Sequence, residues 1–191
     1  MKKLLIMLAL IAGISLGAEA QDEGKSKKEQ KKEEKAAKKA ARKQAQADAV
    51  LKSNALIQSR QWVLEATTLQ GKGGSSVFNL DPNLNFVIVE GEKGTIQLGL
   101  NGLAGWNGVG GVTLEGDVTS YEIRKGKKDG DPVMLNARFS GPGINVTMRL
   151  SVAGEFGDVL ITGTFSNDRL TFRGKLVHPN ESTIFKGRRS N

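Results

Sequence analysis

The sequence contains no cysteine in its 191 residues, which excludes disulfide bonds, thiol chemistry and zinc sites built on cysteine. It has a single histidine, whereas metal sites and histidine-assisted nucleophiles usually need several partner residues. Aromatic residues make up only 5% of the chain, too few for a platform on which nucleic-acid bases stack. The composition therefore predicts no metal, no cofactor and no nucleic-acid partner.

Long apolar runs are also absent except at the start of the chain. Lys2 and Lys3 precede an uncharged, mostly apolar stretch over 4–17, and residues 18–20 (Ala-Glu-Ala) place small side chains where a signal peptidase reads. This stretch is shorter than the roughly 20 residues that cross a bilayer as a helix. We therefore expect residues 1–20 to be a signal peptide, the protein to be exported, and the mature chain to have no transmembrane segment.

Positive charge is unevenly spread. Residues 22–49 carry ten basic and six acidic side chains, a surplus of four that is half of the formal net charge of +8. Lys, Ala, Glu and Gln dominate this stretch and are strong helix formers, yet no apolar heptad runs through it. We interpret 21–47 as a charged spacer, helical or flexible. The alternative is a cationic segment that contacts anionic envelope surfaces such as lipid head groups or wall polymer.

From residue 61 onward apolar side chains alternate with a period of two, which is typical of half-buried strands. The links between the alternating segments are short and carry Gly, Asn, Asp and Pro, which favours antiparallel neighbours. The segments expected to form strands are 61–69, 85–90, 94–100, 112–125, 133–139, 144–152, 158–165 and 169–176.

This pattern predicts a mainly β fold: an antiparallel meander of about eight strands that forms a small barrel or a strongly curved sheet, preceded by a charged N-terminal helix. A two-sheet β-sandwich is the alternative. The apolar parity slips within 112–125, so we expect a β-bulge near Thr119-Ser120. The β body is expected over 48–187, with 188–191 as a basic tail.

Two sets of apolar residues are expected to build the interior. The first is a stripe by which the end of the helix packs onto the β body, made of Val50, Leu51, Leu56 and Ile57. The second is a set of phenylalanines that are candidates to fill the barrel: Phe78, Phe86, Phe139, Phe156, Phe165 and Phe172.

Residues 99–111 read GLNGLAGWNGVGG and form the longest predicted link. A dinucleotide loop would need a third glycine where Thr113 stands and a helix where a strand is expected, so the segment does not predict phosphate binding. Long loops in compact domains are often functional, and a tryptophan in one either covers the core or contacts a ligand. The candidate ligand- or partner-binding residues are Asn101, Trp106, Asn107, Gly108, Gly110 and Gly111.

The sequence shows no catalytic constellation. Glu115 and Asp117 are close enough on one strand for a glycosidase-like pair, but they alternate with Leu114 and Val118 and so fall on the expected solvent face. His178 ends the last predicted strand, where we expect a structural role. We therefore predict no catalytic residues and no enzymatic activity, with a secreted hydrolase using the two carboxylates as the alternative.

The body of the chain resembles a known family. The stretches WVLEATTL, NFVIVEGEKGTIQLG, NGVGGVTLEGDVTSYEI, GKLV and ESTIFKG, spread over about residues 48–187, are similar to the exported domain-of-unknown-function family 4251 of Bacteroidetes. The combination of IQLG, GVGG and the closing ESTIFKG is its most specific part. The resemblance implies a periplasmic or outer-membrane-associated protein of a Gram-negative bacterium, and it implies no activity, ligand or catalytic residue.

These observations favour a non-catalytic periplasmic binding or interaction protein whose ligand the sequence does not identify. A small closed barrel can hold an apolar ligand in its mouth, so the expected partner is a small apolar ligand or an envelope component. The alternative to this function is a protein that associates with polyanions or membrane surfaces through its basic spacer.

Overall fold

The computed structural model describes the chain over 27–71, 77–99, 108, 110–127, 131–142, 144–163 and 169–188. The chain divides into two compact units between Ala41 and Arg42. The described part of the first unit is helical, and all of its described side chains are exposed. The helix α1 (Lys27–Ser59) continues into the second unit, which holds every strand described below. No helix in the described ranges has the length and apolar character that a membrane span needs.

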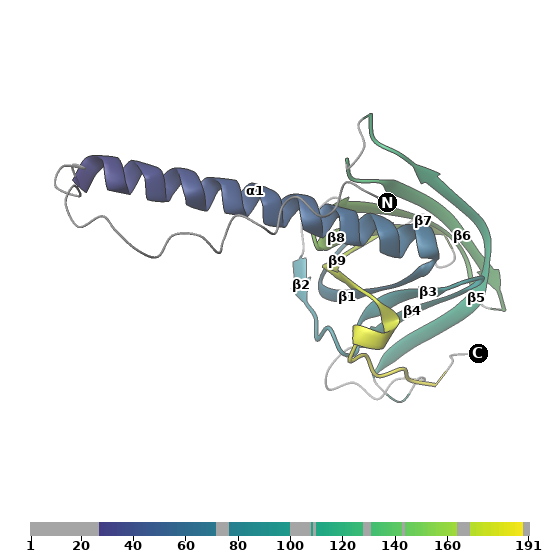
Figure 1. Ribbon diagram of the computed structural model, residues 1–191. Coiled ribbons are helices and arrows are strands. Elements are labelled where there is room, and N and C mark those ends of the chain that lie inside the picture. The colour runs from purple at the N-terminus through teal and green to yellow at the C-terminus, as the bar shows by residue number, and fades with distance from the viewer. Residues whose placement is uncertain are drawn as a thin grey trace. The chain divides into compact units, whose positions relative to one another are not determined.

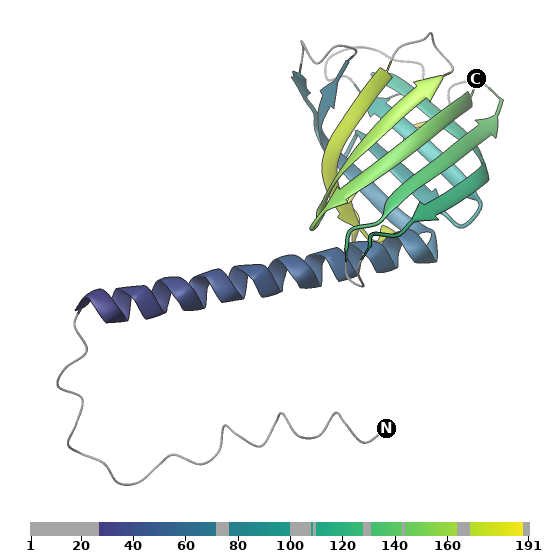
Figure 2. The ribbon, with the colours of Figure 1, turned by 90° about the horizontal axis from the view of Figure 1, so that it is seen from above.

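The second unit is built on one sheet, which has nine strands within the described residues (Figures 1 and 2). Their bounds are β1 (Gln61–Gln70), β2 (Val77–Asn79), β3 (Phe86–Glu90), β4 (Lys93–Gly99), β5 (Gly111–Arg124), β6 (Met134–Gly141), β7 (Ile144–Ala153), β8 (Phe156–Gly163) and β9 (Arg169–Val177). Pairing runs antiparallel in the order β1-β3-β4-β5-β6-β7-β8-β9, and β9 pairs again with β1. These eight strands form a closed barrel, and β2 is an extra strand paired with the end of β1.

The closed barrel confirms the predicted meander, and the two-sheet alternative is wrong because β9 bonds to β1 instead of ending a second sheet. The predicted bulge is also present, since the β5–β6 register shifts between Val118 and Ser120. A second bulge, between Ala66 and Thr68 of β1, was not predicted. Bulges increase local twist, which helps a sheet of this size to close on itself.

The barrel interior is filled by large side chains, which include Trp62, Phe139 and Phe172, each at most 1% exposed. On β4, Gly94 faces this interior, where an added Cβ would lie 2.6 Å from the ring of Phe139. The missing side chain of Gly94 therefore makes room for the ring of Phe139, which lies two strands away on β6.

The expected role of the phenylalanines is only partly correct. Phe139 and Phe172 fill the interior as expected, whereas Phe86 is buried on the outer face of the barrel. Phe78 and Phe156 are exposed, because Phe156 faces outward on β8 and Phe78 lies on β2, the short extra strand. The sixth residue of the set, Phe165, lies outside the described residues.

Helix α1 covers one end of the barrel through its last three turns. Val50 and Ile57 are buried there, and the hydroxyl of Ser53 donates to the carbonyl oxygen of Gly154 in the β7–β8 turn (2.6 Å). The side chain of Asn54 donates to the carbonyl oxygen of Asp131 and accepts from the N–H of Val133, both of which precede β6.

The predicted apolar stripe of the helix therefore needs one correction. Leu56 and Ile57 are buried as expected, but Leu51 is exposed. The buried face follows the helical spacing of 50, 53, 54 and 57, which turns residue 51 to solvent. Two of these four residues are polar, and hydropathy alone does not indicate them.

Tyr121 also connects the end of the helix to the barrel. The hydroxyl of Tyr121 on β5 donates to the carbonyl oxygen of Ile57 (2.6 Å) and accepts from the indole N–H of Trp62 (3.0 Å). Carbonyls at a helix end lack an α-helical partner, so this bond satisfies one of them. Burial raises the pKa of Tyr121 to about 12, more than the hydrogen bond from Trp62 and the nearby Arg60 lower it. The phenol therefore stays protonated and able to donate at neutral pH.

Candidate functional site

The predicted binding segment, residues 99–111, connects β4 to β5. Asn101, Trp106 and Asn107 lie outside the described residues. Gly108 (φ 77°) and Gly110 (φ 80°) have the left-handed backbone that favours glycine, and Gly111 opens β5. A strand and not a helix follows the glycines, so the structure lacks the helix N-terminus of a phosphate loop. Ligand binding by these six residues stays a prediction.

Apolar side chains reach the surface at the end of the barrel where β4 ends and β5 begins. Leu98 and Val112 lie opposite each other on β4 and β5, and Leu98 packs against the interior core, as does Leu170 on β9. Phe78 on β2 lies opposite the core residue Leu69, and directly opposed residues share a face of the sheet. We call Phe78, Leu98, Val112 and Leu170 the apolar rim.

The apolar rim is open to solvent to different degrees. Phe78 is 56% exposed and Val112 is 37% exposed, whereas Leu98 and Leu170 are half-buried. The end covered by α1 differs, because there the core residues Leu56 and Ile57 pack over the strand ends. The rim is therefore one place where the barrel core extends to the surface.

The outer face of the barrel carries a second feature, the C-terminal segment Ser182–Arg188, which we call the strap. The fully buried side chain of Gln97 on β4 donates to the carbonyl oxygen of Phe185 (2.8 Å) and accepts from the N–H of Gly187 (2.8 Å). It also donates to the carbonyl oxygen of Leu84 and accepts from the hydroxyl of Thr113. Both N–H donors and both acceptor sites of this amide are thus matched, by the strap, by Thr113 on β5 and by Leu84 in the turn before β3.

Apolar contacts add to the strap's attachment. Ile184 packs against buried residues on the outer faces of β1, β3 and β9, namely Val63, Phe86, Ile88 and Val177. The strap therefore hides an outer apolar cluster that a bare barrel would expose to water.

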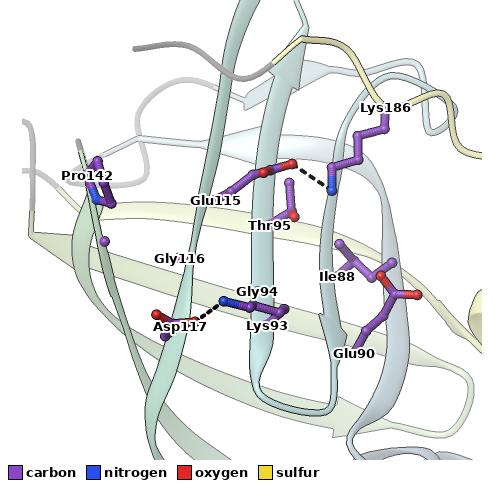
Figure 3. A pocket seen from close by; sticks show the side chains of 11 residues that line it. Ile88, Glu90, Lys93, Gly94, Thr95, Glu115, Gly116, Asp117, Pro142 and Lys186 are labelled. Carbon is purple, nitrogen blue, oxygen red and sulfur yellow. Dashed lines mark hydrogen bonds and ion pairs between the residues drawn. The ribbon is translucent and has the colours of Figure 1, made fainter.

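A pocket of about 390 Å³ lies on the outer faces of β3, β4 and β5 beside the strap (Figure 3). Two ion pairs border it: Lys93 with Asp117, and Lys186 of the strap with Glu115 (2.6 Å). Its lining residues are Ile88, Glu90, Lys93, Gly94, Thr95, Glu115, Gly116, Asp117, Gly141, Pro142 and Lys186.

The two carboxylates of the hydrolase alternative therefore lie where the strand alternation predicts, on the outer face. Each is bound to a lysine, and the side chain of Asp117 is 61% exposed. A glycosidase-like acid and base need contrasting environments within a cleft, and this geometry does not supply them. Glu115 and Asp117 thus act as ion-pair partners at the border of the pocket.

The single histidine has a structural partner. The Nδ1 atom of His178 accepts from the backbone N–H of Asn180 (3.1 Å) and caps the short 3-10 helix η2 (Pro179–Glu181), the structural role expected for it. In the part of the chain that the structure describes, no three His, Cys, Asp or Glu residues are grouped closely enough to hold a metal ion.

The fold and these surfaces define an up-and-down antiparallel β-barrel that is covered by a helix at one end and carries a strap on its outer face. A family model, described as a domain of unknown function (DUF4251), matches residues 38–176. The chain belongs to this family, which confirms the resemblance found in the sequence.

One solved structure places the family in Bacteroides. The crystal structure of a DUF4251 family protein from Bacteroides eggerthii is 29% identical to this chain, with a TM-score of 0.61. The match covers 74% of this chain and 95% of that one. No curated protein matches the chain.

Proposed function

We propose that the protein is a non-catalytic binding protein of the bacterial envelope, and that the open end of its barrel receives an apolar ligand. The observation that carries the proposal is the apolar rim, where the exposed Phe78 and Val112 lie opposite Leu69 and Leu98 of the core and its edge. Burying such side chains under a ligand is favourable by about 25 cal/mol for each Å² of apolar surface. The expected leader over 1–20 supports the placement in the envelope.

The packing of the barrel restricts how deep such a ligand can lie. Phe139 and Phe172 occupy the interior below the rim and are almost completely buried. A ligand would therefore rest on Phe78 and Val112 with a ring or the end of a hydrocarbon chain, and would not thread through the barrel.

The test replaces the two most exposed rim residues. The Phe78→Ser, Val112→Ser double variant is expected to bind the apolar fluorophore N-phenyl-1-naphthylamine at least tenfold more weakly than the wild type. This expectation follows because burial of one large apolar side chain contributes about 1.5–3 kcal/mol. Fluorescence titration measures the affinity, and native mass spectrometry of protein purified from the periplasm reports any ligand carried along.

Phe156→Ser is the matched control, because Phe156 is 52% exposed but lies at the other end of the barrel on the outer face. It should leave fluorophore binding unchanged. Equal losses in the control and the double variant, or no saturable binding by the wild type, would contradict the proposal.

A second candidate function is contact with anionic envelope surfaces through α1. Lys31, Lys35, Lys38 and Lys39 are exposed and follow the spacing i, i+4, i+7 and i+8, which places them on one face of the helix. A basic residue near an anionic membrane contributes about 1 kcal/mol, and salt screens this attraction.

Replacing these four lysines with glutamine is expected to lower binding to phosphatidylglycerol vesicles at least a hundredfold at low salt, measured by co-sedimentation. The wild type should lose binding steeply as salt rises. The matched control replaces four exposed basic residues of the barrel with glutamine: Arg124, Lys125, Lys127 and Arg138. If both variants bind equally, α1 does not carry the interaction.

A further inference from the structure

The outer pocket beside the strap contains one carboxylate that the structure leaves without a charged partner. Glu90, Lys93 and Asp117 lie opposite one another in a row across β3, β4 and β5. Lys93 pairs with Asp117, and Lys186 pairs with Glu115, so both pocket lysines are engaged (Figure 3). Among the described residues, Glu90 has no ion-pair partner. The pocket therefore contains three carboxylates and two ammonium groups, which leaves it with a formal charge of −1, carried by the solvent-exposed Glu90.

A second group in the pocket is a hydroxyl with no bond of its own. Thr95 is only 5% exposed, lines the pocket, and has no hydrogen-bond partner within the described residues. Among the described residues, every fully buried side-chain oxygen or nitrogen has a hydrogen-bond partner. Since the Thr95 hydroxyl has none, its oxygen is not fully buried and is accessible from the pocket. A nearly buried hydroxyl that forms no bond inside the protein is available to a bound molecule.

The strand register brings the hydroxyl and the spare carboxylate within reach of one ligand. Thr95 lies directly opposite Ile88, and Glu90 is two residues further along the same strand, on the same face. Diagonal neighbours of this kind lie about 7–8 Å apart, with their Cβ atoms somewhat closer, a gap that a glutamate side chain and one bound atom can close. On the other side Thr95 is opposite Glu115, whose carboxylate can accept further hydrogen bonds beside the one from Lys186.

We propose that this pocket binds the primary ammonium group of a small aliphatic amine, with Glu90 and Thr95 as its main contacts. An ammonium group has three N–H donors, which match the Glu90 carboxylate, the Thr95 hydroxyl and a spare oxygen of Glu115. The apolar side chains of Ile88 and Pro142 line the same pocket and contact the hydrocarbon part of the ligand. The volume of about 390 Å³ lies within the range of roughly 300–1,000 Å³ typical of small-molecule sites.

The site is separate from the apolar rim. An anion would bind less well, because it would have to displace a carboxylate from Lys93 or Lys186 and would lie beside Glu90. An ammonium group adds the missing charge without breaking either pair, and its binding should weaken with rising salt because the pocket is open to solvent.

Three probes of equal chain length test the proposal on the full-length protein: 1,5-diaminopentane, 1,5-pentanediol and glutarate. In two-dimensional ¹H–¹⁵N spectra the diamine is expected to cause saturable shifts at the amides of β3, β4 and β5 around Thr95, while the diol and glutarate cause none. Glu90→Gln should weaken diamine binding at least fivefold, and the isosteric Thr95→Val at least twofold.

Glu92→Gln is the matched control, because Glu92 is an exposed glutamate in the adjacent turn that does not line the pocket. It should leave diamine binding unchanged. The proposal is overturned if the diamine causes no saturable shifts, if the diol or glutarate binds as well, or if Glu92→Gln weakens binding as much as Glu90→Gln.

Discussion

Replacing Trp62 with alanine is expected to lower the free energy of unfolding by about 3–5 kcal/mol. The side chain is fully buried in the barrel core, and its indole N–H donates to the hydroxyl of Tyr121 (3.0 Å). That hydroxyl in turn donates to the carbonyl oxygen of Ile57 at the end of α1. The substitution therefore leaves a cavity and also disturbs the contact between the helix and the barrel. Urea unfolding followed by far-UV circular dichroism measures the loss.

Trp62→Phe separates the two effects, because it keeps most of the ring volume and removes the N–H donor. It is expected to cost about 1 kcal/mol, the typical net contribution of one hydrogen bond. Since domains are stable by only about 5–15 kcal/mol, the alanine variant should show a much lower unfolding midpoint. A loss below 1 kcal/mol for Trp62→Ala would mean that the indole does not support the core.

The Gln97→Leu substitution is expected to release the strap from the barrel. Leucine has nearly the same volume but cannot bond to Phe185, Gly187 or Thr113, and each buried polar group left without a partner costs about 1–3 kcal/mol. Because the strap loses its two bonds to Gln97 while the barrel keeps its strand pairing, the strap should detach before the barrel unfolds. Amide hydrogen exchange of residues 182–188, compared with that of β7, measures this directly.

The control for this prediction is Gln44→Leu, an exposed glutamine of α1 whose one side-chain bond, to Asp48, is on the surface. It should leave exchange of the strap unchanged. Unaltered exchange of residues 182–188 in Gln97→Leu would show that the remaining contacts, those of Ile184 and the Lys186–Glu115 pair among them, hold the strap without Gln97.

Much of the barrel could be predicted from the sequence because alternation along a strand is a local property. Apolar residues and a glycine stand at every second position of 169–176, and the structure buries three of these positions in β9, namely Phe172, Gly174 and Leu176. The parity slip in 112–125 predicted the bulge for the same reason, since one extra residue moves every later side chain to the other face. The strand β2 was missed because three residues are too few to show alternation.

The candidate sites were harder to predict. The outer pocket joins Glu90 and Thr95 to Lys186 of the strap, and no motif spacing connects residues so far apart in the chain. Glu115 and Asp117 were singled out as a carboxylate pair, but their lysine partners depend on strand register and on the path of the strap. The sequence predicts ligand binding by residues 99–111. The apolar rim lies at the same end of the barrel, where β4 ends and β5 begins.

The sequence by itself determined which faces of the strands are apolar, where the main bulge falls and that the chain belongs to a β family. These properties follow from the period of two along an extended backbone. Only the tertiary structure decided that β9 closes on β1, that Ser53 and Asn54 join the buried face of α1, and that the strap covers the outer sheet. Each of these depends on matching buried donors and acceptors between distant segments, and a local pattern does not specify such matches.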